Sequence, residues 1–131
     1  MGIIAVLVAA LAGYGFGTVW YMSLAKPWMA AAGVEVGDDG RPTNSKDPVP
    51  YIVAFIMAVL VAGMMRHVFV MSGIDTVGKG LMTGLGLGLF VAAPWIVNNV
   101  MFSNKPKSLA LIDGGYAAGG CTVIGLVLAL F

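Results

Sequence analysis

Long apolar runs separated by short polar stretches set the pattern of this chain. An α-helix needs roughly 20 mostly apolar residues to cross about 30 Å of hydrocarbon. Four runs meet that requirement, at residues 3–24, 49–71, 77–102 and 108–131. The pattern therefore predicts an all-α integral membrane protein with four spanning helices in a single transmembrane domain.

The lengths of the polar connections predict how these helices follow one another. Residues 72–76 and 103–107 are enough to turn the chain around and little more. Short connections make neighbouring helices antiparallel, so we expect an up-down-up-down four-helix bundle. The first connection, residues 25–50, is longer and polar.

A short helix is expected at the start of that polar loop. In Lys26-Pro27-Trp28-Met29-Ala30-Ala31-Ala32-Gly33, proline suits the first helical turn and glycine suits the residue after the last. Lys26 and Trp28 would place this helix at the membrane interface, because lysine side chains and indole rings favour the level of the lipid headgroups.

The composition indicates that the lipid bilayer is the main partner of this chain, and it limits which ligands and reactions the sequence can be expected to support. Of the 131 residues, 60% are hydrophobic and 10% are charged, against roughly 25% charged residues in a typical soluble domain. The net charge of +1 gives no reason to expect nucleic acid as a partner. With one cysteine, one histidine and no nucleophile–base pair, the sequence carries no motif for a metal, a cofactor or a catalytic site. We therefore do not expect an enzyme.

The basic residues predict an orientation in the membrane. Lys and Arg are more frequent on the side of the first and third connections, at Lys26, Arg41, Lys46, Lys105 and Lys107, than on the other side, at Arg66 and Lys79. Cytoplasmic loops carry an excess of these residues. We therefore expect the first and third connections in the cytoplasm and both termini on the extracytoplasmic side.

Glycine recurs every four residues on three of the predicted helices. The members of these stripes are Gly13 and Gly17, Gly80, Gly84 and Gly88, and Gly115 and Gly119. A stripe without side chains lets helix backbones approach closely in a membrane, where no hydrophobic effect drives helices together. Two interpretations are open: ordinary packing inside the bundle, or a face for self-association or a partner helix.

Polar side chains are costly in hydrocarbon, and here they concentrate at one depth. Asn98 and Asn99 lie about one turn before the end of the third predicted helix, and Asp113 lies a similar distance after the start of the fourth. The turn between these helices brings the three side chains to nearly the same level, so we expect at least one asparagine to bond the Asp113 carboxyl. The same leaflet contains the aromatic residues Trp20, Tyr21, Trp95 and Tyr116.

Three interpretations of this polar layer are open. In the first, the aromatic side chains form an interface belt, and the Asn and Asp groups bond each other. In the second, the layer lines a small pocket for a polar or lipid-like ligand. In the third, Asp113 takes part in proton or ion movement, although no second acid or buried cation lies in its layer.

Several short motifs carry a resemblance to a known family. They are Gly17-Thr18-Val19-Trp20-Tyr21, Lys26-Pro27-Trp28-Met29, Ile96-Val97-Asn98-Asn99, Lys105-Pro106 and Leu111-Ile112-Asp113-Gly114-Gly115-Tyr116. Together they resemble a family of small bacterial four-span membrane proteins known as domain of unknown function 1761. The resemblance implies a four-helix fold in the bacterial cytoplasmic (inner) membrane and no assigned activity. The family usually has asparagine where this chain has Asp113.

The sequence therefore leads to two hypotheses about function. The leading one is a non-catalytic polytopic membrane protein that acts by helix packing, as a homo-oligomer or as an accessory subunit of a larger membrane complex. The alternative is a binder or transporter of a small solute or lipid that uses the polar layer in the cytoplasmic leaflet. A glycine stripe facing another chain would favour the first hypothesis, and a cavity reaching Asn98 and Asp113 would favour the second.

Overall fold

The structure of the protein is a computed structural model that describes residues 2–131. It is all-α, and its helical segments in chain order are α1 (Gly2–Ser23), α2 (Ala25–Ala32), α3 (Val49–Ser72), α4 (Val77–Leu87), the π-helical segment η1 (Gly88–Ala92), α5 (Ala93–Phe102) and α6 (Lys107–Leu130). α4, η1 and α5 follow one another without a break, so Val77–Phe102 acts as one long helix. Within residues 2–131, four helices are thus long and apolar enough to cross a membrane, as expected of a multi-pass membrane protein.

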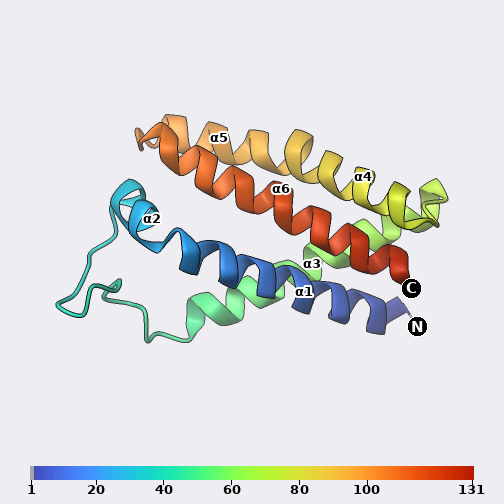
Figure 1. Ribbon diagram of the computed structural model, residues 1–131, viewed down its shortest axis with the longest axis horizontal. Helices are drawn as coiled ribbons and strands as arrows, with labels where there is room; N and C mark the ends of the chain where they lie inside the picture. The colour runs from blue at the N-terminus through green and yellow to red at the C-terminus, as the bar shows by residue number, and fades with distance from the viewer. Residues whose placement is uncertain (1) are drawn as a thin grey trace.

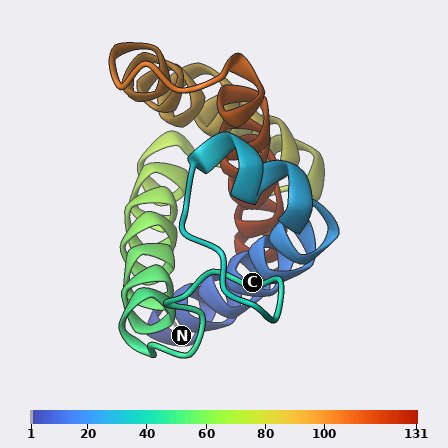
Figure 2. The same ribbon diagram turned by 90° about the vertical axis from the view of Figure 1, so that its left-hand side faces the viewer.

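Figure 1 shows that the molecule has two different ends. Both termini and the α3–α4 connection lie at one end, called here the terminal end. Helix α2, the polar loop and the α5–α6 connection lie at the other, called the loop end. Figure 2, seen from the loop end, shows α2 and the polar loop in front of the helix ends. Most of the irregular backbone therefore lies at the loop end.

Helix α6 is the central helix of the fold. It contacts every other helical segment of residues 2–131, whereas α3 packs mainly against α1 and only slightly against α6. Small residues in the run 114–120 let neighbouring backbones approach α6 closely. The main hydrophobic cluster joins α1, α3 and α6 through Ala5, Ala9, Ala10, Ala58, Ala62, Met65, Phe69, Cys121, Ile124 and Leu128.

The glycine stripe of α4 and η1 lies against the backbone of α6. Its members, all buried, are Gly80, Gly84 and Gly88. A Cβ atom added at Gly84 would collide with the carbonyl oxygen of Cys121, and one added at Gly88 would lie 2.6 Å from the carbonyl oxygen of Ala117. Gly125 of α6 faces the stripe in return, since its Cβ would lie 2.5 Å from the carbonyl oxygen of Gly80. This stripe therefore contacts another helix of the same chain.

The third long helix contains an irregular turn next to its proline. In η1 the backbone N–H of Ala93 donates to the carbonyl of Gly88, five residues earlier. Pro94 follows at once; it has no N–H to donate, and its ring conflicts with the carbonyl four residues before it. A wider π-type turn at this point accommodates the proline while the helix continues.

The short helix α2 and the polar loop are held to the rest of the loop end. Gly33 ends α2 in a left-handed conformation with φ +70°, which glycine adopts without steric cost. The Lys105 ammonium donates a 3.0 Å hydrogen bond to the carbonyl of Ala32 in the last turn of α2. Farther along, Val36 and Pro42 form an isolated antiparallel bridge that closes a small turn. The loop thus has defined structure.

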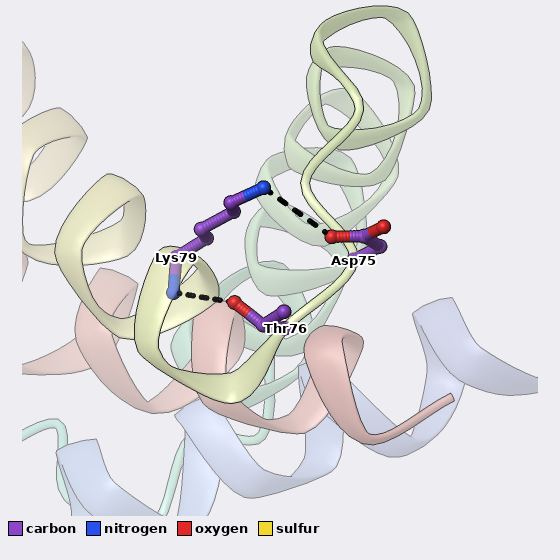
Figure 3. A network of polar contacts seen from close by, with 3 residues as sticks. All are labelled: Asp75, Thr76 and Lys79. Carbon is purple, nitrogen blue, oxygen red and sulfur yellow. Dashed lines mark hydrogen bonds and ion pairs between the residues drawn. The ribbon is translucent and has the colours of Figure 1, made fainter.

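The terminal end contains an ion pair beside the start of α4. Lys79 lies 3.5 Å from Asp75, and both side chains are exposed. Figure 3 shows this pair together with Thr76, whose hydroxyl accepts a hydrogen bond from the backbone N–H of Lys79 and caps α4. An exposed pair of this kind contributes little to stability, but it neutralises the charge of Lys79.

Candidate functional site

Two side-chain hydrogen bonds join α1 to α6 near the loop end. The hydroxyl of Tyr21 donates to Oδ1 of Asp113 at 2.6 Å. One residue earlier, Nε1 of Trp20 donates to the carbonyl oxygen of Ile112 at 2.9 Å. All the groups involved are partly buried. In hydrocarbon such bonds keep costly polar groups satisfied, so they fix the register of α1 against α6.

Aromatic rings and glycines interlock along the same interface. The ring of Tyr116 on α6 lies over Gly17 on α1, where an added Cβ would be 2.6 Å from a ring carbon. In the opposite direction, the ring of Trp20 lies over Gly115, where an added Cβ would be 2.7 Å from a ring carbon. Phe16 lies over Gly119 in the same way. Each glycine therefore makes room for a ring of the other helix.

These rings also contact one another and form a continuous aromatic cluster. Phe16 stacks with Trp20 and with Tyr116, at centroid distances of 5.7 and 6.5 Å. Tyr21 makes edge-to-face contacts with Tyr116 at 5.2 Å and with Trp28 at 5.9 Å. Edge-to-face and offset-stacked rings attract one another beyond the area they bury. The cluster links α1, α2 and α6 around the Tyr21–Asp113 hydrogen bond.

The structure divides the polar layer that the sequence predicted. It brings together Trp20, Tyr21, Asp113 and Tyr116. It leaves Asn98, Asn99 and Trp95 exposed on α5, the last with 69% of its surface accessible. Within residues 2–131, no side-chain hydrogen bond joins either asparagine to Asp113, whose recorded partner is Tyr21. The expected Asn–Asp bond is replaced by a Tyr–Asp bond between the first and last helices.

The rotational position of the asparagines on α5 explains this difference. Helix α5 packs inward through Ala93, Ile96 and Val100, which are spaced three and four residues apart. Each residue turns an α-helix by about 100°, so Asn98 lies nearly opposite that inward face and Asn99 lies to its side. Equal depth was therefore not enough to bring them to Asp113.

The two interfacial residues of the predicted short helix have different surroundings. Lys26 is exposed, as a headgroup-level cation would be. Trp28 is half-buried and packs against a second hydrophobic cluster that contains Ala31, Val100 and Leu109. Trp28 therefore anchors α2 to α5 and α6 as well as contacting Tyr21.

A cavity of about 620 Å³ opens beside the aromatic cluster. It lies between α1, α2, the polar loop and the start of α3, at the loop end. Its aromatic lining consists of Tyr14, Tyr21, Trp28, Tyr51 and Tyr116, and Arg41 of the polar loop also lines it. Cavities of this size, mostly apolar with a few polar groups, are typical sites for small molecules.

The tyrosines that line the cavity differ in the hydrogen bonding of their hydroxyls. The hydroxyl of Tyr21 donates to Asp113, and that of Tyr51 donates to the carbonyl of Ser45 at 2.9 Å. Those of Tyr14 and Tyr116 have no hydrogen-bond partner among the described residues, yet neither is sealed from its surroundings. Two accessible hydroxyls thus belong to tyrosines that line a largely apolar cavity.

Residues 2–131 hold no group of His, Cys, Asp and Glu placed to ligate a metal.

Tyr14, Phe16 and Arg41 belong to this site but were not singled out from the sequence as site residues. Phe16 precedes Trp20 by four residues, and Tyr14 precedes Tyr21 by seven. Residues at these spacings share one face of a helix, so an aromatic face of α1 could have been recognised. Nothing local marks Arg41, because only the path of the polar loop brings it to the cavity.

Comparison with known proteins identifies the family of the chain. No curated protein and no solved structure matches it significantly. The family model described as "Protein of unknown function (DUF1761)" matches residues 4–129, which include all four long helices almost completely. The chain therefore belongs to the DUF1761 family.

Proposed function

We propose that this protein binds a small amphiphilic, lipid-like molecule in the tyrosine-lined cavity at its loop end. The observation that carries the proposal is the cavity of about 620 Å³, whose lining includes Tyr14 and Tyr116, two tyrosines with hydroxyls that have no hydrogen-bond partner among the described residues. A cavity walled by rings favours an apolar ligand, and the free hydroxyls favour a ligand with oxygen atoms that accept hydrogen bonds. The function is binding, without chemical conversion.

The lining residues suggest how such a ligand is oriented. Met22 and Met29 offer flexible apolar surface for its body. Arg41 comes from the polar loop, outside the four long apolar helices, and also lines the cavity. A ligand with an apolar tail and an acidic or strongly polar head therefore fits the lining, with the head toward Arg41.

Extraction in a mild detergent, followed by mass spectrometry of small molecules and lipids that copurify, tests this proposal. Ala54 of α3 lines the cavity, so Ala54→Phe should fill part of it. Val53 is the adjacent residue, does not line the cavity and is 45% exposed. Val53→Phe is therefore the matched control, because it adds the same ring about 100° around the same helix.

We expect wild type and Val53→Phe to retain one molecular species, enriched over the bulk lipid extract, and Ala54→Phe to lose it. Equal retention by Ala54→Phe would contradict the proposal. So would a wild-type preparation with nothing enriched above bulk lipid.

A role in assembly, as a homo-oligomer or as an accessory subunit of a larger membrane complex, is the second proposal. One observation bears on it: α3 packs mainly on α1 and only slightly on α6, so the side of α3 that carries Ile56, Leu60 and Met64 is open to lipid or to another helix. The glycine stripes no longer support it, since their close contacts are with residues of the same chain. Light scattering of the detergent-solubilised protein tests the homo-oligomer, and a protein mass of one chain would exclude it.

A further inference from the structure

A second, smaller cavity lies at the terminal end, far from the tyrosine-lined one along the helices. It has a volume of about 410 Å³ and forms a groove between the start of α1 and the last turns of α3. Its apolar floor includes Ile3, Leu7, Val59 and Val70, and Gly63 leaves it open. Arg66 and His67 also line this groove. It therefore combines an apolar floor with two basic side chains.

Arg66 is half-buried in this groove and has no anionic partner among residues 2–131. Its guanidinium lies over Gly2, where an added Cβ would be 2.9 Å from Cζ. The ion pair recorded for residues 2–131 joins Lys79 to Asp75, so it does not involve Arg66 (Figure 3). None of the side-chain hydrogen bonds of the described residues comes from the Arg66 guanidinium either. Its donors therefore have no acceptor among the described residues, in a groove lined mostly by apolar side chains.

An unpaired guanidinium beside hydrocarbon is costly unless it finds an anion. Arg66 lies about 9 Å from the end of α3, at about 1.5 Å per residue. An arginine at that depth reaches the phosphate level with its long side chain while its stem stays in apolar surroundings. The planar fork of a guanidinium matches two oxygens of a phosphate. The groove below it runs between two membrane helices and is apolar, which suits an acyl chain.

We propose that Arg66 binds the phosphate of an anionic phospholipid whose acyl chain lies in the groove between α1 and α3. His67 is exposed at the same groove and adds a second hydrogen-bonding group for the headgroup. Free phosphate could pair with Arg66 but would leave the apolar groove uncovered. A phospholipid would both pair with the guanidinium and cover the groove. This lipid site is separate from the tyrosine-lined cavity and does not depend on the function proposed for it.

Native mass spectrometry of the full chain in detergent tests this site. Wild type is mixed in turn with phosphatidylglycerol, phosphatidylcholine and inorganic phosphate. Arg66→Gln removes the unpaired cation. Lys79→Gln is the matched control, since it removes a cation from the same end of the molecule, but one already paired with Asp75. A third variant, Gly63→Leu, places a side chain in the groove where an added Cβ would meet nothing within 4 Å.

We expect wild type and Lys79→Gln to prefer phosphatidylglycerol over phosphatidylcholine by about tenfold, because the choline cation of phosphatidylcholine offsets the charge of the phosphate that Arg66 would bind. Arg66→Gln should lose this preference, and Gly63→Leu should weaken binding of both lipids while its thermal stability stays at the wild-type level. Equal losses in Arg66→Gln and Lys79→Gln would overturn the proposal in favour of general surface charge. Competition by inorganic phosphate at the same concentration as the lipid would overturn the assignment to a phospholipid.

Discussion

The hydroxyl of Tyr21 donates a 2.6 Å hydrogen bond to Oδ1 of Asp113 and so joins the first membrane helix to the last. The two residues are 92 positions apart in the chain. Around this bond the structure gathers the aromatic cluster and the tyrosine-lined cavity. A change to this hydrogen bond should therefore affect both the stability of the fold and the shape of the proposed binding site.

Removing the donor of this bond should destabilise the protein by a modest amount. Tyr21→Phe keeps the ring contacts and loses the hydroxyl, so we expect a loss of roughly 0.5–2 kcal/mol, the range of hydrogen bonds between membrane helices. Unfolding in mixed micelles by titration with a denaturing detergent measures this loss. Tyr14→Phe, on the same helix, is the control, because that hydroxyl has no protein partner among the described residues. Equal losses from both changes would mean that the Tyr21 bond contributes nothing specific.

Asp113, the acceptor of this bond, should be replaceable by asparagine, which has an amide side chain, but not by leucine, which has an aliphatic one. Asp113→Asn keeps an oxygen that accepts from Tyr21 and removes a charge that is costly to bury, so stability should be equal to or above wild type. Asp113→Leu leaves the Tyr21 hydroxyl without an acceptor and should cost roughly 1–3 kcal/mol. Thermal unfolding of the three proteins in one detergent compares them. If asparagine proved as damaging as leucine, the negative charge itself would be what the site requires.

Replacing glycine by alanine on α4 should destabilise the protein at Gly84, which belongs to the stripe, but not at Gly86, two residues away. A Cβ added at Gly84 meets the backbone of Cys121, whereas one added at Gly86 meets nothing within 4 Å. Gly84→Ala should therefore cost on the order of 1–3 kcal/mol through overpacking. Gly86→Ala should be neutral or stabilising by up to about 1 kcal/mol, because alanine is the better helix former. Melting temperatures measured side by side test this difference, and equal values would show that α4 does not pack on α6 as described.

The excess of basic residues at the loop end predicts that this end faces the cytoplasm. In a Cys121→Ser background, a single cysteine at Ser103→Cys should resist an impermeant thiol reagent in intact cells, and one added after Phe131 should react. Ser103 is exposed and directly follows α5, in the α5–α6 connection, so access of the reagent is limited by the membrane alone. Labelling of Ser103→Cys in intact cells, without labelling at the other position, would reverse the predicted orientation.

The local features of the fold could be predicted because each depends on a short segment. The four long helices follow from runs of apolar residues that lie within a few positions of the observed bounds, since hydrocarbon allows a lone segment to satisfy its backbone only as a helix. The end of α2 at Gly33 follows from the freedom of glycine to adopt a positive φ. The repeat of four in Gly80, Gly84 and Gly88 marked a face for close packing, although it did not identify what packs there.

The partners of those residues were decided by tertiary structure. Depth along the membrane normal can be counted from a sequence, and it placed Asn98 and Asn99 level with Asp113. Whether two side chains meet also depends on how each helix is rotated and on which helices are neighbours. Because α5 turns Ala93 and Val100 toward α6, its asparagines face elsewhere, and Tyr21 of α1 reaches the carboxyl instead. The sequence by itself determined which segments are long and apolar enough to cross a membrane, and the packing of helices distant in the chain decided which side chains form the candidate site.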